Sequence, residues 1–305
     1  MPTHTAKLIV NPNADLGRAW RTASDLRPIV DEFGGADWSG TVYPTHASEL
    51  ARQAGEQGYT LVVAVGGDGT VHEVINGLMQ LPADKRPRLG VVPLGSGNDF
   101  AHTLGVPLQA HNALRQVFLG KPRRIDVGRL QDNLGRVEYF DNTVGLGFDA
   151  TVTIRSRKFG YLRGFLIYLL AVLQTIALNH DAVQLKVTTD LEEWDEAMLM
   201  LTLCNGPREG GGFAVAPEAR IDDGILQYAA VRKVSRPMML RLLPEVMAGT
   251  HGRFPQVRLG QFHTLQVQAD KPLVMHIDGE VFAGFGSHVQ ALNIEIQPGA
   301  LEVMV

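Results

Sequence analysis

The segment Gly66-Gly67-Asp68-Gly69-Thr70 places three glycines, a carboxylate and a hydroxyl directly after a valine-rich run. Glycines lack Cβ atoms, so backbone N–H groups there can approach a polyphosphate, and a helix that begins at this point adds a favourable dipole. Asp68 would bind Mg²⁺ or accept a proton among the phosphates. Glu73 and Asn76 follow Thr70 at steps of three and share one face of the expected helix. The alternative is a structural turn in which Asp68 and Thr70 cap the helix.

A second glycine-rich turn runs from Pro93 to Phe100 and contains Gly95, Ser96 and Asn98. It also follows an apolar run that predicts a strand. Two such turns at neighbouring strand ends can form one nucleotide site. Asn11, which ends the first apolar run, would lie at the same edge. A helix N-cap is an equally simple role for Asn98.

Two acidic segments in the second half are candidates for chemistry. Asp278-Gly279-Glu280 places two carboxylates two residues apart, and an extended backbone would put both on one face of a strand. An acidic β-turn is the alternative. Asp222-Asp223-Gly224 predicts a hairpin turn. His276 is expected to be a local hydrogen-bonding residue rather than a catalyst.

The elements that position these residues differ between the two halves. From Ala6 to about Arg129, short apolar runs such as Leu61–Val65 alternate with helical segments, which predicts parallel strands joined by helices. Thr41-Val42-Tyr43 is one of the expected strands. After Leu130 the strand-like runs predominate and indicate antiparallel β-structure. The expected domains are therefore an α/β domain over residues 1–129 and a β-rich domain over residues 130–305, with a return of the last strand to the first domain as an option.

Composition limits the classes of function. The chain has 305 residues, 45% of them hydrophobic, with a net charge of −4. This charge gives no basic field for a phosphate backbone, so no nucleic-acid partner is expected. Cys204 is the only cysteine, and no signal peptide is visible, which favours the cytoplasm. The most apolar stretch, Phe165–Leu178, would form a helix of about 21 Å, too short to span a bilayer.

The order of these segments resembles the catalytic domain of diacylglycerol kinases, in the branch that also holds sphingosine and ceramide kinases. The matching segments follow one another along nearly the whole chain: Gly66–Gly77, Pro93–Ala101, Asn142–Asp149, Asn205-Gly206, Gly210–Phe213, Pro217, Asp222-Asp223-Gly224 and Asp278-Gly279-Glu280. One departure lies at Asn13-Ala14-Asp15-Leu16-Gly17, where the family usually has a small residue and glycine. There Asp15 would add negative charge near the phosphates.

The resemblance implies an enzyme that binds ATP between an α/β domain and a β-sandwich, with Mg²⁺ as cofactor. The positions that it assigns to the nucleotide are Asn11, Gly66, Glu73, Ser96 and Glu280, with Asp68 at the phosphates. The two glycine turns add the candidate contacts Gly67, Gly69, Thr70, Gly95 and Asn98. Asp278 matches the proposed general base, and Asp68 is the alternative base. Asp222, Asp223 and the carbonyl of Ile225 match a structural Mg²⁺ site, since a hard cation takes oxygen ligands.

The function expected from this resemblance is transfer of the ATP γ-phosphoryl group to a lipid hydroxyl, with diacylglycerol to phosphatidic acid, a step of phospholipid biosynthesis, as the leading reaction. An NAD kinase, or a non-catalytic lipid-binding protein of the same fold, is the alternative. The basic and aromatic stretch Arg155–Tyr168 is the candidate for peripheral contact with an anionic membrane. Arg163, within this stretch, could instead contact the phosphates. Most of Leu166–Leu178 is expected to form a buried core helix. The oligomeric state is open, with a homodimer among the options.

Overall fold

The computed structural model describes residues 5–159, 165–179 and 181–305. Residues 160–164 of the expected membrane-contacting stretch, which include Tyr161 and Arg163, lie outside the described residues. The chain forms two compact units, one of Met1–Val127 with Gly299–Val305 and the other of Gly128–Pro298. Below they are called unit 1 and unit 2.

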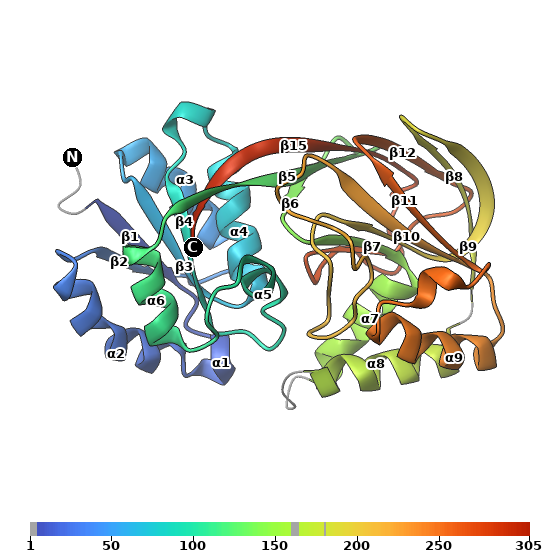
Figure 1. The fold of residues 1–305 in the computed structure, drawn as a ribbon, viewed down its shortest axis with the longest axis horizontal. Coiled ribbons are helices and arrows are strands. Elements are labelled where there is room, and N and C mark those ends of the chain that lie inside the picture. The colour runs from blue at the N-terminus through green and yellow to red at the C-terminus, as the bar shows by residue number, and fades with distance from the viewer. Residues whose placement is uncertain (1–4, 160–164, 180) are drawn as a thin grey trace. The chain divides into compact units, whose positions relative to one another are not determined.

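Unit 1 has a parallel sheet in the order β4-β3-β1-β2, with the end of β15 added beside β4. The strands are β1 (Ala6–Val10), β2 (Asp37–Gly40), β3 (Leu61–Gly66), β4 (Arg88–Pro93) and β15 (Ala291–Met304). The helices are α1 (Ala14–Gly17), α2 (Ala19–Glu32), α3 (His46–Gln57), α4 (Asp68–Met79), α5 (Asp99–Leu104) and α6 (Ala110–Leu119), with a 3₁₀ turn at Ala83–Lys85. Helices flank the sheet on both faces (Figure 1). Their apolar sides and the valine-rich strands form the core.

The register of this sheet brings three loops to one edge. Val10 of β1 pairs with Val65 of β3, and Gly66 pairs with Pro93 of β4. Because the three strands are parallel, the segments that follow them begin side by side. This edge is the one that the sequence assigned to the nucleotide.

The expected strand at Thr41-Val42-Tyr43 is wrong. The strand beside β1 is β2, in which Ser39 pairs with Ile9. Val42 is 78% exposed, and its N–H is donated to the His46 side chain. The β-branched run is thus part of the loop that leads into α3, because the sheet pairing is completed by the residues just before it.

Unit 2 is built mainly from antiparallel strands. They are β5 (Pro122–Asp132), which begins in unit 1, β6 (Val137–Phe140), β7 (Thr143–Gly147), β8 (Val183–Thr189), β9 (Glu193–Cys204), β10 (Leu226–Arg232), β11 (Val257–Phe262), β12 (Thr264–Ala269), β13 (Met275–Ile277), β14 (Glu280–Ala283) and the first part of β15. The pairing runs β14-β13-β7-β9-β8-β12-β15, and β10 joins β9 to β11. The α/β fold followed by an antiparallel β-sandwich is confirmed.

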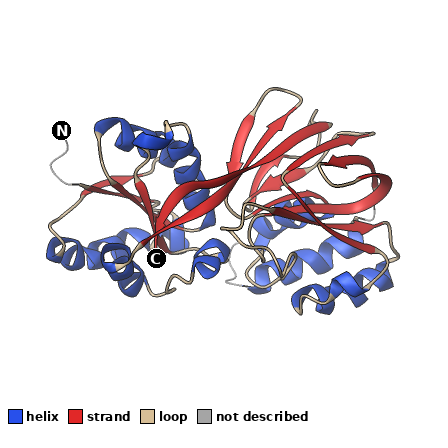
Figure 2. Ribbon diagram, turned by 45° about the horizontal axis from the view of Figure 1, so that its top comes forward, coloured by secondary structure: helices blue, strands red, loops and turns tan. Residues whose placement is uncertain are grey.

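Three helices cover one side of these strands, as Figure 2 shows. They are α7 (Phe148–Ser156), α8 (Phe165–Leu178) and α9 (Arg236–Met247), with 3₁₀ turns at Arg157–Phe159 and His251–Arg253. Two buried clusters result, one among the strands and one between the strands and the helices. The second contains Ala171, Val172 and Ile176 of α8 together with Met239 and Leu242 of α9. The two helices therefore pack on a common core.

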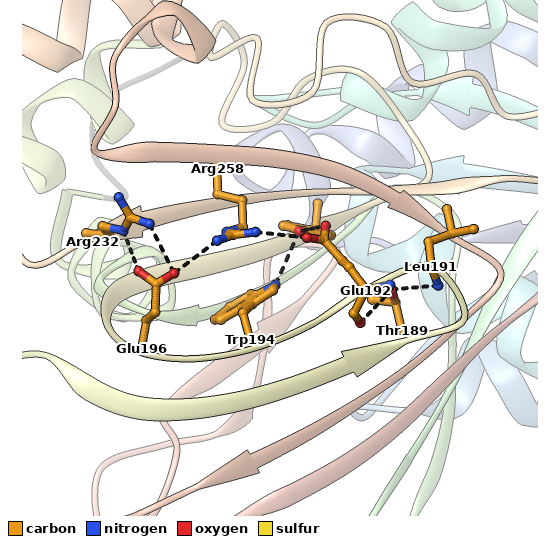
Figure 3. Close-up of polar contacts among 8 residues, drawn as sticks. Thr189, Leu191, Glu192, Trp194, Glu196, Arg232 and Arg258 are labelled. Atoms are coloured by element: carbon orange, nitrogen blue, oxygen red, sulfur yellow. Dashed lines mark hydrogen bonds and ion pairs between the residues drawn. The ribbon is translucent and has the colours of Figure 1, made fainter.

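A charged network crosses β9, β10 and β11 (Figure 3). The Arg258 guanidinium lies 2.8 Å from the Glu192 carboxylate and 3.0 Å from that of Glu196. Arg232 also donates to Glu196, and this bond is the main reason that the pKa of Glu196 lies below its ordinary value. Burial, with the bond to Glu192, raises the pKa of Tyr228 to about 12. Cross-strand pairs of this kind hold the three strands in register.

Candidate nucleotide and acceptor sites

The glycine segment at the end of β3 has the geometry that its sequence predicts. β3 ends at Gly66, and α4 begins at Asp68 after an extended Gly67. The N–H groups at the start of a helix point outward along its axis, in the direction from which an anion can approach. Asp68 and Gly69 belong to this turn, so their N–H groups lie at the positive end of the helix dipole. The segment provides an anion-binding geometry.

Thr70 organises this segment from below. It is buried, and its hydroxyl accepts a hydrogen bond from Asn11 Nδ2 at 3.2 Å. A Cβ atom on Gly66 would lie 2.3 Å from Thr70 Oγ1, so only glycine fits at the end of β3. Asn11, Gly66 and Thr70 therefore hold the first and third strand ends together.

The two glycine turns touch through their backbones. A Cβ atom on Gly95 would lie 2.6 Å from Gly67 Cα, and one on Gly67 would lie 3.0 Å from Gly95 Cα. The N–H of Asn98 is donated to Asp68 Oδ2 at 2.7 Å. The Asn98 side chain closes its own turn by bonding both the N–H and the carbonyl of Gly95, each at 2.9 Å. Asp68 belongs to the first turn, and its carboxylate bonds to the second turn.

Most of the predicted phosphate-contacting residues are accessible. Ser96 is exposed, and Gly67, Asp68, Gly69, Gly95 and Asn98 are partly exposed. The structure brings these six together at one edge of the unit 1 sheet. Gly66 and Thr70 lie beneath them in the interior.

In the described structure, Glu73 has a different role from the other residues that were predicted to bind the nucleotide. Its carboxylate accepts the N–H of Thr45 at 2.9 Å and that of Ala47 at 3.0 Å. These groups lie at the start of α3, where a carboxylate satisfies helix donors and complements the dipole. Glu73 therefore fixes α3 against α4. No local pattern in the chain predicts this contact, because Ala47 is 26 residues away from Glu73.

The unusual loop after Asn11 is also part of this edge. Asp15 and Leu16 have left-handed φ values of 49° and 55°. The N–H of Asp15 is donated to the carbonyl of Leu94 at 3.2 Å, so the loop packs on the second glycine turn. Arg18 lies 3.2 Å from the Asp15 carboxylate and balances its charge.

In unit 2, Asp278 lies in a tight turn between β13 and β14. Ile277 pairs with Glu280, and both Asp278 and Gly279 have positive φ, 48° and 81°. This is the geometry of a two-residue hairpin. The expected extended backbone, with both carboxylates on one face, is therefore wrong. Asp278 is buried, whereas Glu280 is exposed and forms an ion pair with Arg157 at 2.7 Å.

The Asp278 carboxylate sits among backbone donors. It accepts the N–H groups of Asp141, Asn142 and Thr143 at 3.2, 2.9 and 2.9 Å. Charge-assisted bonds of this kind are stronger than neutral ones. They fix the carboxylate and tie the hairpin to the start of β7.

Beside this turn lies a buried group that the sequence did not reveal. His276 Nε2 is 3.4 Å from Asp149 Oδ2 and 3.9 Å from Glu209 Oε2, and Thr202 donates to Asp149 at 2.6 Å. Gly145 leaves room for the group, because a Cβ there would lie 2.2 Å from both Asp149 and His276. No spacing along the chain predicts this cluster, since its members come from separate elements.

The ionisation of this cluster follows from its surroundings. Burial opposes the charge on Asp149, but the imidazole of His276 and the hydrogen bonds outweigh it, so the pKa of Asp149 lies below its ordinary value. The N–H of Gly279 is donated to His276 Nδ1 at 3.3 Å. His276 thus acts as a local hydrogen-bonding residue, as expected, and supports the turn that carries Asp278.

The candidate Mg²⁺ ligands form a compact turn before β10. Asp223 Oδ1 accepts the N–H of Ile225 at 3.1 Å, and Gly224 has a φ of 75°. A hydrogen bond from a backbone N–H to the aspartate side chain two residues earlier is typical of turns. Asp222 Oδ1 lies 3.4 Å from the Arg220 guanidinium. The oxygen donors are of the type that Mg²⁺ takes, and Arg220 is a competing cation at Asp222.

These features define the class of the protein as a phosphotransferase with an α/β unit and a β-sandwich unit. The diacylglycerol kinase catalytic domain matches residues 5–130, and the YegS C-terminal NAD kinase beta sandwich-like domain matches residues 142–305. The chain therefore belongs to the YegS-like lipid kinase family, and it is a kinase.

Individual relatives agree with this assignment. The chain is 36% identical over 233 residues to "Probable lipid kinase YegS-like" of Chromohalobacter salexigens, covering 76% of this chain and 73% of that protein. A protein of the same name from Yersinia pestis is 30% identical over 253 residues and 82% of each chain. Two solved structures from Bacillus anthracis, whose names refer to diacylglycerol kinase, have TM-scores of 0.79 and 0.73 at 22% and 20% identity. Each covers 98% of this chain and 96% of its own, which shows the shared fold.

Proposed function

We propose that this lipid kinase transfers the γ-phosphoryl group of ATP to the free hydroxyl of diacylglycerol and forms phosphatidic acid. The observation that carries the proposal is the direct contact between the two glycine turns at Gly67 and Gly95, beside Asp68. It places backbone donors, a helix N-terminus and a carboxylate at one accessible edge. Phosphoryl transfer is achieved chiefly by positioning and charge stabilisation of this kind.

Each predicted group has a task in this proposal. The N–H groups of Gly67, Asp68 and Gly69, with Gly95, Ser96 and Asn98 of the second turn, hold the phosphates. Asn11, Gly66 and Thr70 keep the turns in place, and Glu73 keeps α3 in place. Mg²⁺, when bound, neutralises phosphate charge.

The proposed general base is Asp278, and Asp68 is the alternative. Asp278 is held by three backbone donors, so it would exchange one of these bonds for the acceptor hydroxyl as it takes the proton. Glu280 is proposed to act at the nucleotide side of the reaction. Glu280 and its present partner, Arg157, are both exposed to solvent.

Asp222, Asp223 and the Ile225 carbonyl are proposed to hold a structural Mg²⁺ ion. The support is the donor set of this turn, which offers carboxylate and carbonyl oxygens within four residues. The ion would displace Arg220 from Asp222 and stiffen the entrance to β10. A melting temperature that rises with added Mg²⁺, and rises less in Asp223→Ala, would support this site.

The test of the reaction is an assay with labelled ATP and Mg²⁺ against a panel of lipid alcohols in mixed micelles. The panel contains diacylglycerol, a sphingoid base and ceramide, and NAD serves as a soluble acceptor. We expect labelled phosphatidic acid as the main product. Labelled NADP with no labelled lipid would overturn the proposal, and so would labelling of only the sphingoid base or ceramide.

A further inference from the structure

Helix α8 has an apolar face that no other described element covers. The helix contains no charged residue between Phe165 and Leu178. Its inner side, with Ala171, Val172 and Ile176, packs on the core beneath it. Its outer side carries four leucines that are 39–62% exposed: Leu166, Leu170, Leu173 and Leu178. A helix that is apolar all round and yet exposed on one face is typical of proteins that meet an apolar partner.

The neighbouring helix α9 extends this face. α8 and α9 cover the same core cluster and lie side by side in Figure 1. Their outer sides therefore point the same way, away from that core. On α9, Leu240 is 49% exposed and Met247 is 42% exposed. We call the exposed apolar residues of the two outer sides the α8–α9 face: Leu166, Leu170, Leu173, Leu178, Leu240 and Met247.

The charged residues of α8, α9 and the 3₁₀ turn after α7 are mainly basic. Arg236 and Arg241 are exposed on α9, and Lys158 is exposed in the turn that follows α7. Arg236 also joins the helices by donating to the carbonyl of Ile176 at 3.0 Å. The one acidic residue of α9, Glu245, is buried and lies 2.5–2.6 Å from Arg241 and Arg253. An apolar surface with a cationic border complements a bilayer that contains anionic lipid.

We infer that the α8–α9 face docks the enzyme onto the surface of an anionic lipid bilayer. The inference rests on the proposed function, because a kinase for diacylglycerol must reach its substrate within the membrane. Among the described residues no helix is long and apolar enough to cross a membrane. The helices would lie in the plane of the interface, with the leucines at the acyl boundary and the arginines at the headgroups.

This docking surface differs from the one that the sequence suggested. Most of Leu166–Leu178 was expected to be buried, but a third of its residues are exposed leucines or alanine. From the described part of the basic stretch before it, Lys158 contributes to the border, whereas Arg155 and Arg157 have other partners. Arg157 pairs with Glu280, and Arg155 bonds to Asn179 at the end of α8.

The test compares the wild-type chain with Leu170→Ser/Leu173→Ser in vesicle sedimentation. Vesicles contain phosphatidylcholine with or without phosphatidylglycerol, at low and high salt. Loss of each leucine should lower the partition coefficient on the order of 10-fold. Binding of the wild type should be stronger to the anionic vesicles and should weaken as salt rises. The matched control is Leu134→Ser/Leu191→Ser, which replaces two leucines that are 54% and 65% exposed in turns elsewhere in unit 2.

Three results would overturn this inference. The first is a Leu170→Ser/Leu173→Ser protein that binds the vesicles as strongly as the wild type and has an unchanged melting temperature. The second is an equal loss in the control variant. The third is a wild-type dimer that the leucine substitutions make monomeric without any change in vesicle binding, because the face would then join two copies of the chain.

A second measurement separates docking from chemistry. Turnover on a short-chain diacylglycerol, kept below its micelle concentration, should be equal in the wild type and in Leu170→Ser/Leu173→Ser. Turnover on vesicles containing long-chain diacylglycerol should fall with the partition coefficient. A protein that binds vesicles through these leucines but phosphorylates no lipid would contradict the proposed function and leave docking intact.

Discussion

Gly67 and Gly95 approach so closely that neither position has room for an unhindered Cβ atom. An added Cβ on Gly95 would lie 2.6 Å from Gly67 Cα, and the reverse distance is 3.0 Å. The two residues come from different turns, one after β3 and one after β4. Their contact joins the predicted phosphate-binding segments into one surface.

Substitution of either glycine should weaken binding of Mg-ATP. Gly95→Ala forces the turns apart, and Gly67→Val also covers the N–H groups that are proposed to hold the phosphates. Loss of one or two charge-assisted hydrogen bonds corresponds to roughly 10–100-fold in affinity. Titration calorimetry measures the affinity for Mg-ATP. Gly284→Ala is the control, because a Cβ atom at Gly284 would meet only Val281, at 3.9 Å. A folded Gly67→Val protein with normal ATP affinity would show that the phosphates bind elsewhere.

Asp278→Asn should reduce both turnover and stability. Removal of a general base lowers kcat by about 10²–10⁴. An asparagine also turns an amide N–H₂ toward at least one of the three backbone donors that the carboxylate now satisfies, which costs about 1–3 kcal/mol of the free energy of unfolding. Steady-state kinetics and urea unfolding give the two quantities separately.

Asp68→Asn is the companion variant. It removes the charge that accepts the Asn98 N–H at 2.7 Å, so affinity for Mg-ATP and turnover should both fall. Near-normal kcat in Asp278→Asn, together with loss of activity in Asp68→Asn, would assign the base role to Asp68.

Glu73→Ala should destabilise unit 1 through α3. The substitution leaves the N–H groups of Thr45 and Ala47 without their carboxylate, at a cost of about 1–3 kcal/mol. Chemical unfolding measures this loss. Glu56→Ala is the control, because it removes only a surface pair with Arg52 and should cost about 0.5 kcal/mol or less. An unchanged unfolding free energy together with weaker ATP binding would point to a direct nucleotide contact instead.

The stability of unit 2 should depend on pH through Asp190. Burial alone would raise the pKa of the Asp190 carboxyl. Hydrogen bonds from the His263 side chain and from the N–H groups of His263 and Thr264 stabilise the charged carboxylate more strongly, so the pKa of Asp190 is lowered to about 2. Since the unfolded pKa is about 3.9, the stabilisation is present above about pH 4 and is lost as the pH falls toward 2. Its size is at most about 2 kcal/mol.

Asp190→Asn should therefore be less stable than the wild type at neutral pH, and the difference should shrink on acidification. Urea unfolding across this pH range measures the difference in the free energy of unfolding between the variant and the wild type. Asp84→Asn, at an exposed position, is the control. A difference that stays constant from neutral pH to pH 3 would contradict the assignment.

The features that depend on near neighbours in the chain could be predicted from the residues alone. Valine-rich runs followed by glycines predicted strands that end at Val65 and Val92, one residue before the observed ends at Gly66 and Pro93. Burial on both faces favours such strands, and the absence of Cβ permits tight turns. The order of segments identified the kinase family and, through the resemblance, the β-sandwich, while the shift to strand-like runs after Leu130 predicted antiparallel β-structure.

Tertiary structure alone decided the contacts between distant segments. Asp278 and Asn142 are 136 residues apart in sequence, and their bond depends on how β13 pairs with β7. The capping of α3 by Glu73 and the burial of His276 beside Asp149 arise in the same way. Exposure of Leu170 and Leu173 was also unpredictable, because helical periodicity finds an apolar face only when the opposite face is polar, and α8 has no charged face to mark its outer side.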